Sequence, residues 1–160
     1  MIRNRAISSR KKLVIVVIVF ILVLLFILLQ LRNLVFQHCV THTDHSKTHT
    51  HTQLKIIQDG REIQVPSNVA VTDACMHPLH THDATGLIHM EFPLPFTFFL
   101  GDFFDVMGTK FSDTQIGSIR TFDGYTIRIK KNGKIISSMY RFISLQDLDK
   151  IEIMIQRTKK

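Results

Sequence analysis

The sequence predicts an α+β protein: one N-terminal transmembrane helix followed by a small, β-rich domain with one short helix. An unbroken apolar run lies near the start, short alternating segments bounded by turn residues follow it, and one later segment has helical spacing. We expect a basic tail over 1–12, a transmembrane helix over 13–31, a histidine-rich stalk over 32–52 and the domain over 53–157. The chain beyond the apolar run has about 110 residues, enough for one modest core.

The N-terminal segment has the composition of a single-pass membrane anchor. Leu13 to Leu29 is uninterrupted apolar sequence, near the lower limit for crossing a hydrocarbon core about 30 Å thick. Five basic residues precede it and two follow within the next twenty, so the N-terminus should face the cytoplasm and the domain should lie outside the cytoplasmic membrane. A cleaved signal peptide is the alternative, but residues 33–38 offer no small-residue cleavage site.

The net charge says little about a partner. The formal value is +7, but the tail before the apolar run contributes most of it. The rest of the chain shows no basic patch interleaved with aromatic residues, so we expect no nucleic-acid partner.

Turn residues predict two hairpins in the domain. Strand-like residues 54–58 and 62–65 flank Asp59-Gly60-Arg61, and residues 125–130 and 134–138 flank Lys131-Asn132-Gly133. Asp-Gly and Asn-Gly are strong signals for tight turns.

Spacing predicts the helix and the last strand. One apolar face recurs at i, i+3, i+4 and i+7, closed by Gly108 at the C-cap position; its members are Leu100, Phe103, Phe104 and Met107. Ile151, Ile153 and Ile155 alternate as a final strand. The order hairpin, hairpin, helix, hairpin, strand is an α+β layout, and the closing Leu-x-x-Leu-Asp-Lys-Ile-x-Ile segment resembles that of β-grasp domains.

A third hairpin, between Cys75 and Glu91, is the candidate site. If Ala84 and Thr85 are its turn residues, His80 faces His89 across the two strands. Because side chains alternate along a strand, one face then carries His80, His82, His89 and Glu91. The other face carries Leu79, Thr81, Ile88, Met90 and Phe92.

The polar face suits a copper or zinc ion. Three neutral imidazoles on adjacent strands can converge on one ion, and a carboxylate can complete the shell or orient a ring from behind. The alternative is a solvated polar face, in which Asp83 serves only the turn. We also count His77, Asp83 and Cys75 as possible ligands, the last as a soft donor favouring copper.

The stalk adds further histidines. Five lie in a Thr-rich tract over 38–52, which suggests low-affinity metal capture, or a solvated linker whose last His-x-His joins the first strand. We expect His49 and His51 to belong to the hairpin site. Cys39 and Cys75 invite a disulfide in an exported chain, but their positions lead us to favour free thiols.

The motif that begins at Cys75 resembles a group of poorly characterised exported or membrane-anchored bacterial and archaeal proteins. It runs Cys-x4-His-Thr-His-Asp-x2-Gly-x-Ile-His-x-Glu, with His49-x-His51 before it and a Phe-rich segment after it. The resemblance covers roughly residues 49–155. It implies a shared fold and a shared metal, and brings no established activity.

Three function classes follow. The first is a membrane-anchored, extracytoplasmic copper- or zinc-binding protein. It would serve a membrane metalloenzyme by delivering the metal, as an accessory protein or as a structural subunit. The second is a zinc-dependent hydrolase or hydratase-like enzyme with Glu91 as base, by analogy with the carbonic anhydrase site. The third is a small single-helix subunit of a larger membrane complex, such as a copper oxidase or monooxygenase. The sequence shows no nucleophile arrangement or phosphate-binding loop, and we assign no catalytic residue.

Overall fold

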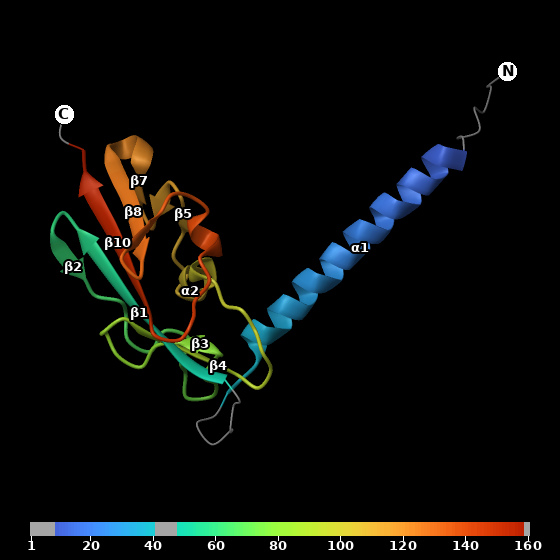
Figure 1. The fold of residues 1–160 in the computed structure, drawn as a ribbon. Helices are drawn as coiled ribbons and strands as arrows, with labels where there is room; N and C mark the ends of the chain where they lie inside the picture. Colours follow the sequence, from blue (N-terminus) through green and yellow to red (C-terminus); the bar gives the residue numbers. More distant parts are fainter. Residues whose placement is uncertain (1–8, 41–47, 159–160) are drawn as a thin grey trace. The chain divides into compact units, whose positions relative to one another are not determined.

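The computed structural model describes residues 9–40 and 48–158, and the chain forms two compact units, one ending at Gln37 and one beginning at His38 (Figure 1). The first contains one long helix. The second is β-rich with one short α-helix. The expected α+β class is therefore confirmed.

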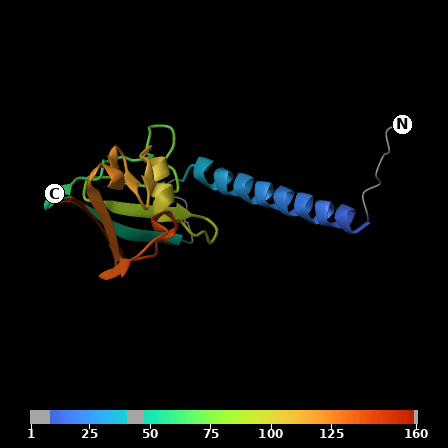
Figure 2. The same cartoon turned by 90° about the horizontal axis from the view of Figure 1, so that it is seen from above.

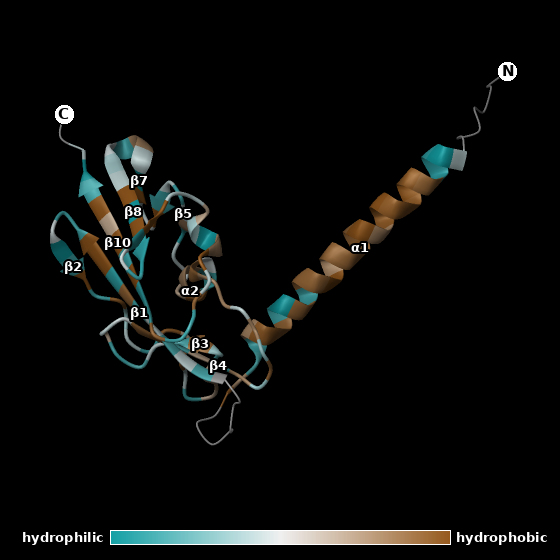
Figure 3. Ribbon diagram, in the orientation of Figure 1, coloured by the Kyte–Doolittle hydropathy of each residue, from teal (hydrophilic) through white to brown (hydrophobic). Residues whose placement is uncertain are grey.

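The helix of the first unit, α1 (Ser9–Gln37), is long and apolar enough to cross a membrane. It contains the whole segment expected over 13–31 and extends beyond it at both ends. Figure 3 colours the ribbon of α1 as hydrophobic over most of its length, with a hydrophilic N-terminal turn. A helix that packs on the surface of a soluble domain is amphipathic, whereas one that is apolar all round suits a lipid environment.

The second unit is built on a seven-stranded mixed sheet with the order β3-β4-β1-β10-β8-β9, and β2 also pairs with β1. The first and last strands, β1 and β10, are parallel neighbours, and every other pair is antiparallel. This central parallel pair flanked by hairpins is the expected β-grasp-like arrangement. The strands are β1 (Thr48–Gln58), β2 (Arg61–Ile63), β3 (Leu79–His80), β4 (Leu87–Phe92), β8 (Tyr125–Lys131), β9 (Lys134–Ile136) and β10 (Asp149–Arg157).

One face of the sheet carries the hydrophobic core. Ile151, Ile153 and Ile155 of β10 are buried, as the alternation predicts. They align with buried residues on both neighbouring strands, such as Leu54 of β1 and Ile129 of β8. Fully burying a branched apolar side chain contributes about 1.5–3 kcal/mol, so this face holds the strands in register.

The short helix α2 (Leu100–Val106) lies on one side of the sheet in both views (Figures 1 and 2). Leu100, Phe103 and Phe104 are completely buried, and Gly108 follows the C-cap with a φ of 68°. The predicted helix is thus confirmed. The sequence did not suggest the other elements of this side: a three-stranded sheet of β5 (Phe111–Ser112), β6 (Gln115–Ile116) and β7 (Ile119–Arg120), and the 3₁₀ turns η1 (Thr121–Asp123) and η2 (Tyr140–Phe142).

Both tight turns form as their chemistry predicts. Asp59 and Gly60 connect β1 to β2 with φ values of 49° and 81°. Asn132 and Gly133 connect β8 to β9 with φ values of 51° and 78°. Two successive positive φ angles define the hairpin turn that matches the twist of the flanking strands.

The first strand begins earlier than the sequence suggested. β1 starts at Thr48 rather than at Leu54, so His49 and His51 are strand residues instead of part of a stalk. This is the alternative in which the last His-x-His joins the first strand. The stalk histidines His42 and His45 lie outside the described residues.

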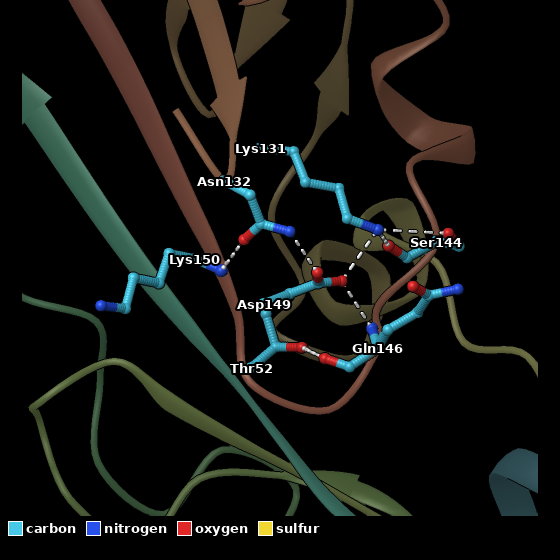
Figure 4. A network of polar contacts seen from close by, with 7 residues as sticks. All are labelled: Thr52, Lys131, Asn132, Ser144, Gln146, Asp149 and Lys150. Carbon is cyan, nitrogen blue, oxygen red and sulfur yellow. Dashed lines mark hydrogen bonds and ion pairs between the residues drawn. The ribbon is translucent and has the colours of Figure 1, made fainter. Parts of the chain in front are cut away.

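A buried carboxylate fixes the loop that leads into β10. Asp149, only 4% exposed, accepts hydrogen bonds from the Asn132 side chain and the Gln146 amide, both at 2.8 Å (Figure 4). Lys131 Nζ lies 2.8 Å from Oδ2 of the same carboxylate and also donates to the carbonyl of Ser144. A buried charge with this many partners is compensated, and the network holds the loop against β1 and β8.

The loop between β3 and β4 approaches the backbone of β1 at Gly86. The Leu54 amide donates to the Gly86 carbonyl at 2.8 Å, and Gly86 has a φ of 81°. A Cβ at this position would lie 2.1 Å from the carbonyl oxygen of Leu54. Gly86 therefore lets the loop dock onto the strand that carries His49 and His51.

We predict that Gly86→Ala lowers the free energy of unfolding by at least about 1 kcal/mol more than Gly60→Ala does. Gly60 has the same φ of 81°, and a Cβ added there would meet no atom within 4 Å. The Gly60 variant therefore measures the cost of the backbone conformation alone, about 1–2 kcal/mol. Urea unfolding of both variants measures the difference. Equal losses of unfolding free energy in the two variants would show that the backbone shifts to remove the contact with Leu54 at no cost.

Candidate metal centre

Three adjacent strands bring the candidate ligands together. β3 pairs with β4 so that His80 faces His89, as the even-length turn predicts. β4 pairs with β1 so that His89 faces His51 and Glu91 faces His49. These residues alternate with the core residues of their strands, so they lie on the face of the sheet opposite the core. The site thus combines the predicted hairpin with the expected His-x-His pair.

The inner part of the site consists of His80, His82 and His89. One nitrogen from each ring lies within 4.8 Å of the others. The Nε2 atoms of His80 and His82 are 3.2 Å apart. In a tetrahedral site with bonds of about 2.0–2.1 Å, neighbouring ligand atoms are roughly 3.3–3.4 Å apart. The two rings therefore already stand at ligand-to-ligand spacing.

A hydrogen bond to the backbone sets the orientation of the His80 ring. Its side chain is 0% exposed, and its Nδ1 lies 2.8 Å from the carbonyl oxygen of His77. Because a carbonyl only accepts, Nδ1 carries the proton and the lone pair of neutral His80 is on Nε2, facing His82. Metal-binding histidines are typically oriented by such a bond from the other ring nitrogen.

The outer part of the site consists of His49, His51 and His89, whose nitrogens also lie within 4.8 Å of one another. Nε2 of His49 is 3.3 Å from Nδ1 of His89. The rings of His51 and His89 meet edge to face with centroids 4.5 Å apart. His89 therefore belongs to both groups.

Glu91 lies between the two groups. Its carboxylate is 2% exposed, and Oε1 is 3.0 Å from Nε2 of His49 and 3.9 Å from Nε2 of His80. Among the described residues, this oxygen has no donor in hydrogen-bonding geometry. A buried carboxylate oxygen in that state is costly. A cation beside it would compensate the charge.

The surroundings keep His89 neutral. Burial lowers the pKa of His89 to about 4, with the neighbouring His51 and His82 adding to the effect. A protonated ring cannot bind a metal, so a depressed pKa preserves the ligand form in mildly acidic solution.

The strand before the turn is shorter than expected. β3 ends at His80, because Thr81 bonds away from the hairpin: its hydroxyl donates to the Pro66 carbonyl and accepts from the Val69 amide. His82 therefore follows the strand instead of pairing with Leu87. It nevertheless reaches the inner group, as its nitrogen distance to His80 shows.

Asp83 serves the turn. Its Oδ1 accepts hydrogen bonds from the amide and hydroxyl of Thr85, which hold the pKa of Asp83 below its usual value. Neither histidine group among the described residues includes Asp83. The structure thus matches the interpretation in which this carboxylate stabilises the loop.

The expectation of free thiols is wrong. Cys39 and Cys75 form a disulfide, and metal binding requires a thiolate, so Cys75 is not a candidate soft ligand in this state. The His77 ring lies beside the disulfide, with Nδ1 3.9 Å from the Cys75 sulfur, and it joins neither histidine group among the described residues. His77 contributes its backbone carbonyl to the site instead.

The sequence did not reveal the groups that hold β1 at the site. The His51 amide donates to Asp147 Oδ1 at 2.9 Å, and the Leu148 amide donates to the His51 carbonyl at 2.8 Å. Both partners are almost a hundred positions away in the chain. The only sequence signal was that Asp147 lies next to a turn, and such Asp residues are too common to show which strand they contact.

The chain matches no protein-family model, no curated protein and no solved structure. The resemblance to exported proteins with the His-Thr-His-Asp motif therefore stays a prediction, and the site is interpreted from its own geometry.

We predict that Cys39→Ser/Cys75→Ser lowers the free energy of unfolding by about 3–4 kcal/mol, because the disulfide closes a loop over a sequence separation of 36. The full chain in detergent, unfolded with urea before and after reduction, provides the measurement. The folded variant should still bind metal. Loss of metal without loss of fold would place the sulfur atoms in the site.

Proposed function

We propose that this protein is a membrane-anchored, extracytoplasmic metal-binding protein that holds copper or zinc through the histidines of β1, β3 and β4. The observation that carries the proposal is that five imidazoles, from β1, β3, β4 and the residue two positions after β3, form two overlapping groups beside the buried Oε1 of Glu91, which lacks a hydrogen-bond donor among the described residues. A solvated polar face does not require a buried carboxylate or an imidazole with no exposure.

The chemistry of the donors supports both ions. Neutral imidazole and carboxylate suit zinc and copper(II). The disulfide leaves no thiolate beside the site to favour copper(I). The donor set alone therefore does not separate the two metals, and metal analysis decides between them.

A holding role fits the site better than hydrolysis with Glu91 as base. A general base must come within hydrogen-bonding reach of a substrate or a water. The carboxylate of Glu91 is only 2% exposed and lies between His49 and His80. A protein that delivers metal to a membrane metalloenzyme, or is a structural part of one, needs only a bound ion. Its carboxylate does not have to reach a substrate or a water.

Two features support the membrane topology. The basic residues before the apolar helix favour a cytoplasmic N-terminus. The disulfide of the second unit suits an oxidising compartment. Together they support a single-pass protein of the cytoplasmic membrane with its domain outside.

The test of binding is metal content by mass spectrometry on the full chain, purified in detergent with a tag that contains no histidine. We predict at least about one equivalent of copper or zinc per chain. His89→Ala should weaken binding tenfold or more, as roughly 1.4 kcal/mol or more is lost with a direct ligand. The matched control is His38→Ala, which removes an exposed histidine outside both groups.

Less than about a tenth of an equivalent, after dialysis against both metals, would refute the proposal. If His38→Ala weakened metal binding as much as His89→Ala does, the binding would be non-specific and would not come from the proposed site.

Topology is tested separately with single cysteines. The native cysteines are joined in a disulfide, so only an introduced thiol should react. We predict that a membrane-impermeant maleimide labels Ser138→Cys in intact cells and leaves Ser9→Cys unlabelled until the membrane is opened. The reverse pattern would invert the orientation. Mature protein lacking α1 would identify a cleaved signal.

A further inference from the structure

The ring of His89 lies at the centre of the cluster. Its centroid is 4.5 Å from His51 and 4.6 Å from His82, and the rings of His80 and His49 are only slightly farther away, at 5.2 and 5.6 Å. An imidazole has two ring nitrogens. Nδ1 of His89 faces His49. One residue therefore touches both ligand groups.

The five histidines do not form one coordination sphere. The described nitrogens divide into two groups within 4.8 Å, and no single group contains all five rings. Two ligands of one ion with bonds of about 2.1 Å can be at most about 4.2 Å apart. A single ion therefore cannot bind all five rings as they stand.

The two groups differ in their access to solvent. In the outer group, the side chain of His49 is 44% exposed. The inner group also contains a solvent-accessible ring, His82, but His80 in it has no exposure and is oriented by the carbonyl of His77. The inner group therefore has one buried, oriented ligand, and the outer group has none. Exposed ligands meet a hydrated ion first, and buried, oriented ligands release it less readily.

We propose, on the basis of the proposed function, that the domain has two metal positions that share His89: an outer one with His49 and His51, and an inner one with His80 and His82. A neutral imidazole donates one lone pair, so when both positions are filled His89 releases its ring proton to solvent and bridges the two ions as an imidazolate. The outer position captures the ion and the inner one retains it. Transfer replaces the two outer imidazoles by the two inner ones while His89 stays beside the ion. No change in oxidation state is involved.

Glu91 fits this arrangement as the group between the positions. Its Oε1, which lacks a hydrogen-bond donor among the described residues, faces one member of each group, His49 at 3.0 Å and His80 at 3.9 Å. A negative charge there lowers the energy of a cation in either position and between them. The carboxylate therefore links the two positions electrostatically.

The test is a zinc titration of the metal-stripped full chain in detergent, in competition with a chromophoric chelator. We expect two binding steps, about one equivalent each, with the second at least about tenfold weaker. His49→Ala/His51→Ala should abolish the weak step and keep the tight one. These two side chains are partly exposed, so the variant should keep its fold.

The reciprocal variant is His80→Ala/His82→Ala, which should abolish the tight step and leave one weak equivalent. Because His80 is buried, its fold is checked by circular dichroism and by retention of the disulfide. His38→Ala is the control and should show both steps unchanged. The number of binding steps in the unaltered protein tests the proposal even if a variant fails to fold.

The outcomes separate the two proposals. One saturating equivalent, weakened similarly by both double variants, would overturn the two-position inference and leave metal binding intact. Loss of the tight step in His49→Ala/His51→Ala, with the weak one kept, would reverse the assignment of capture and retention and overturn the transfer direction. No binding in the parent would overturn both proposals.

Discussion

The antiparallel pairing of β1 with β4 is the constraint on which the candidate metal centre depends. It places His51 opposite His89 and His49 opposite Glu91. A slip of one residue would turn both β1 histidines toward the core and expose the threonines between them. The hydrophobic core prevents that slip, since Leu54 further along β1 must face the buried isoleucines of β10.

The same strand is held from its other edge by polar contacts. Thr52 donates to the Gln146 carbonyl, and the backbone of His51 bonds with Asp147 and Leu148 in the same loop. That loop is in turn held by the buried carboxylate of Asp149. The part of β1 that carries the outer histidines is thus fixed by a loop almost a hundred positions further along the chain, and such supporting contacts hold the geometry of a site.

Local chemistry made the hairpins and the inner ligand group predictable. Asp59-Gly60 and Asn132-Gly133 define their turns, and the turn after Asp83 sets His80 opposite His89. The start of β1 was missed because alternating Thr and His give no apolar signal. Its pairing with β4 joins residues about forty positions apart, and the partners of Asp149 depend on the packed fold. The Cys39–Cys75 disulfide was compatible with the sequence but not favoured by it, because only the fold shows that the two cysteines meet.

The buried carboxylate of Glu91 has a consequence for the life of the protein in the cell. A carboxylate this deeply buried and without a hydrogen-bond donor for one oxygen weakens the folded state. A cation that binds only the folded chain restores stability, by about 2.7 kcal/mol when the free ion is at a hundred times its dissociation constant. Chains without metal would then unfold more often and be removed by proteases. With the proposed ion bound at the site, the abundance of the protein would therefore follow the supply of that ion, without any change in the protein's synthesis.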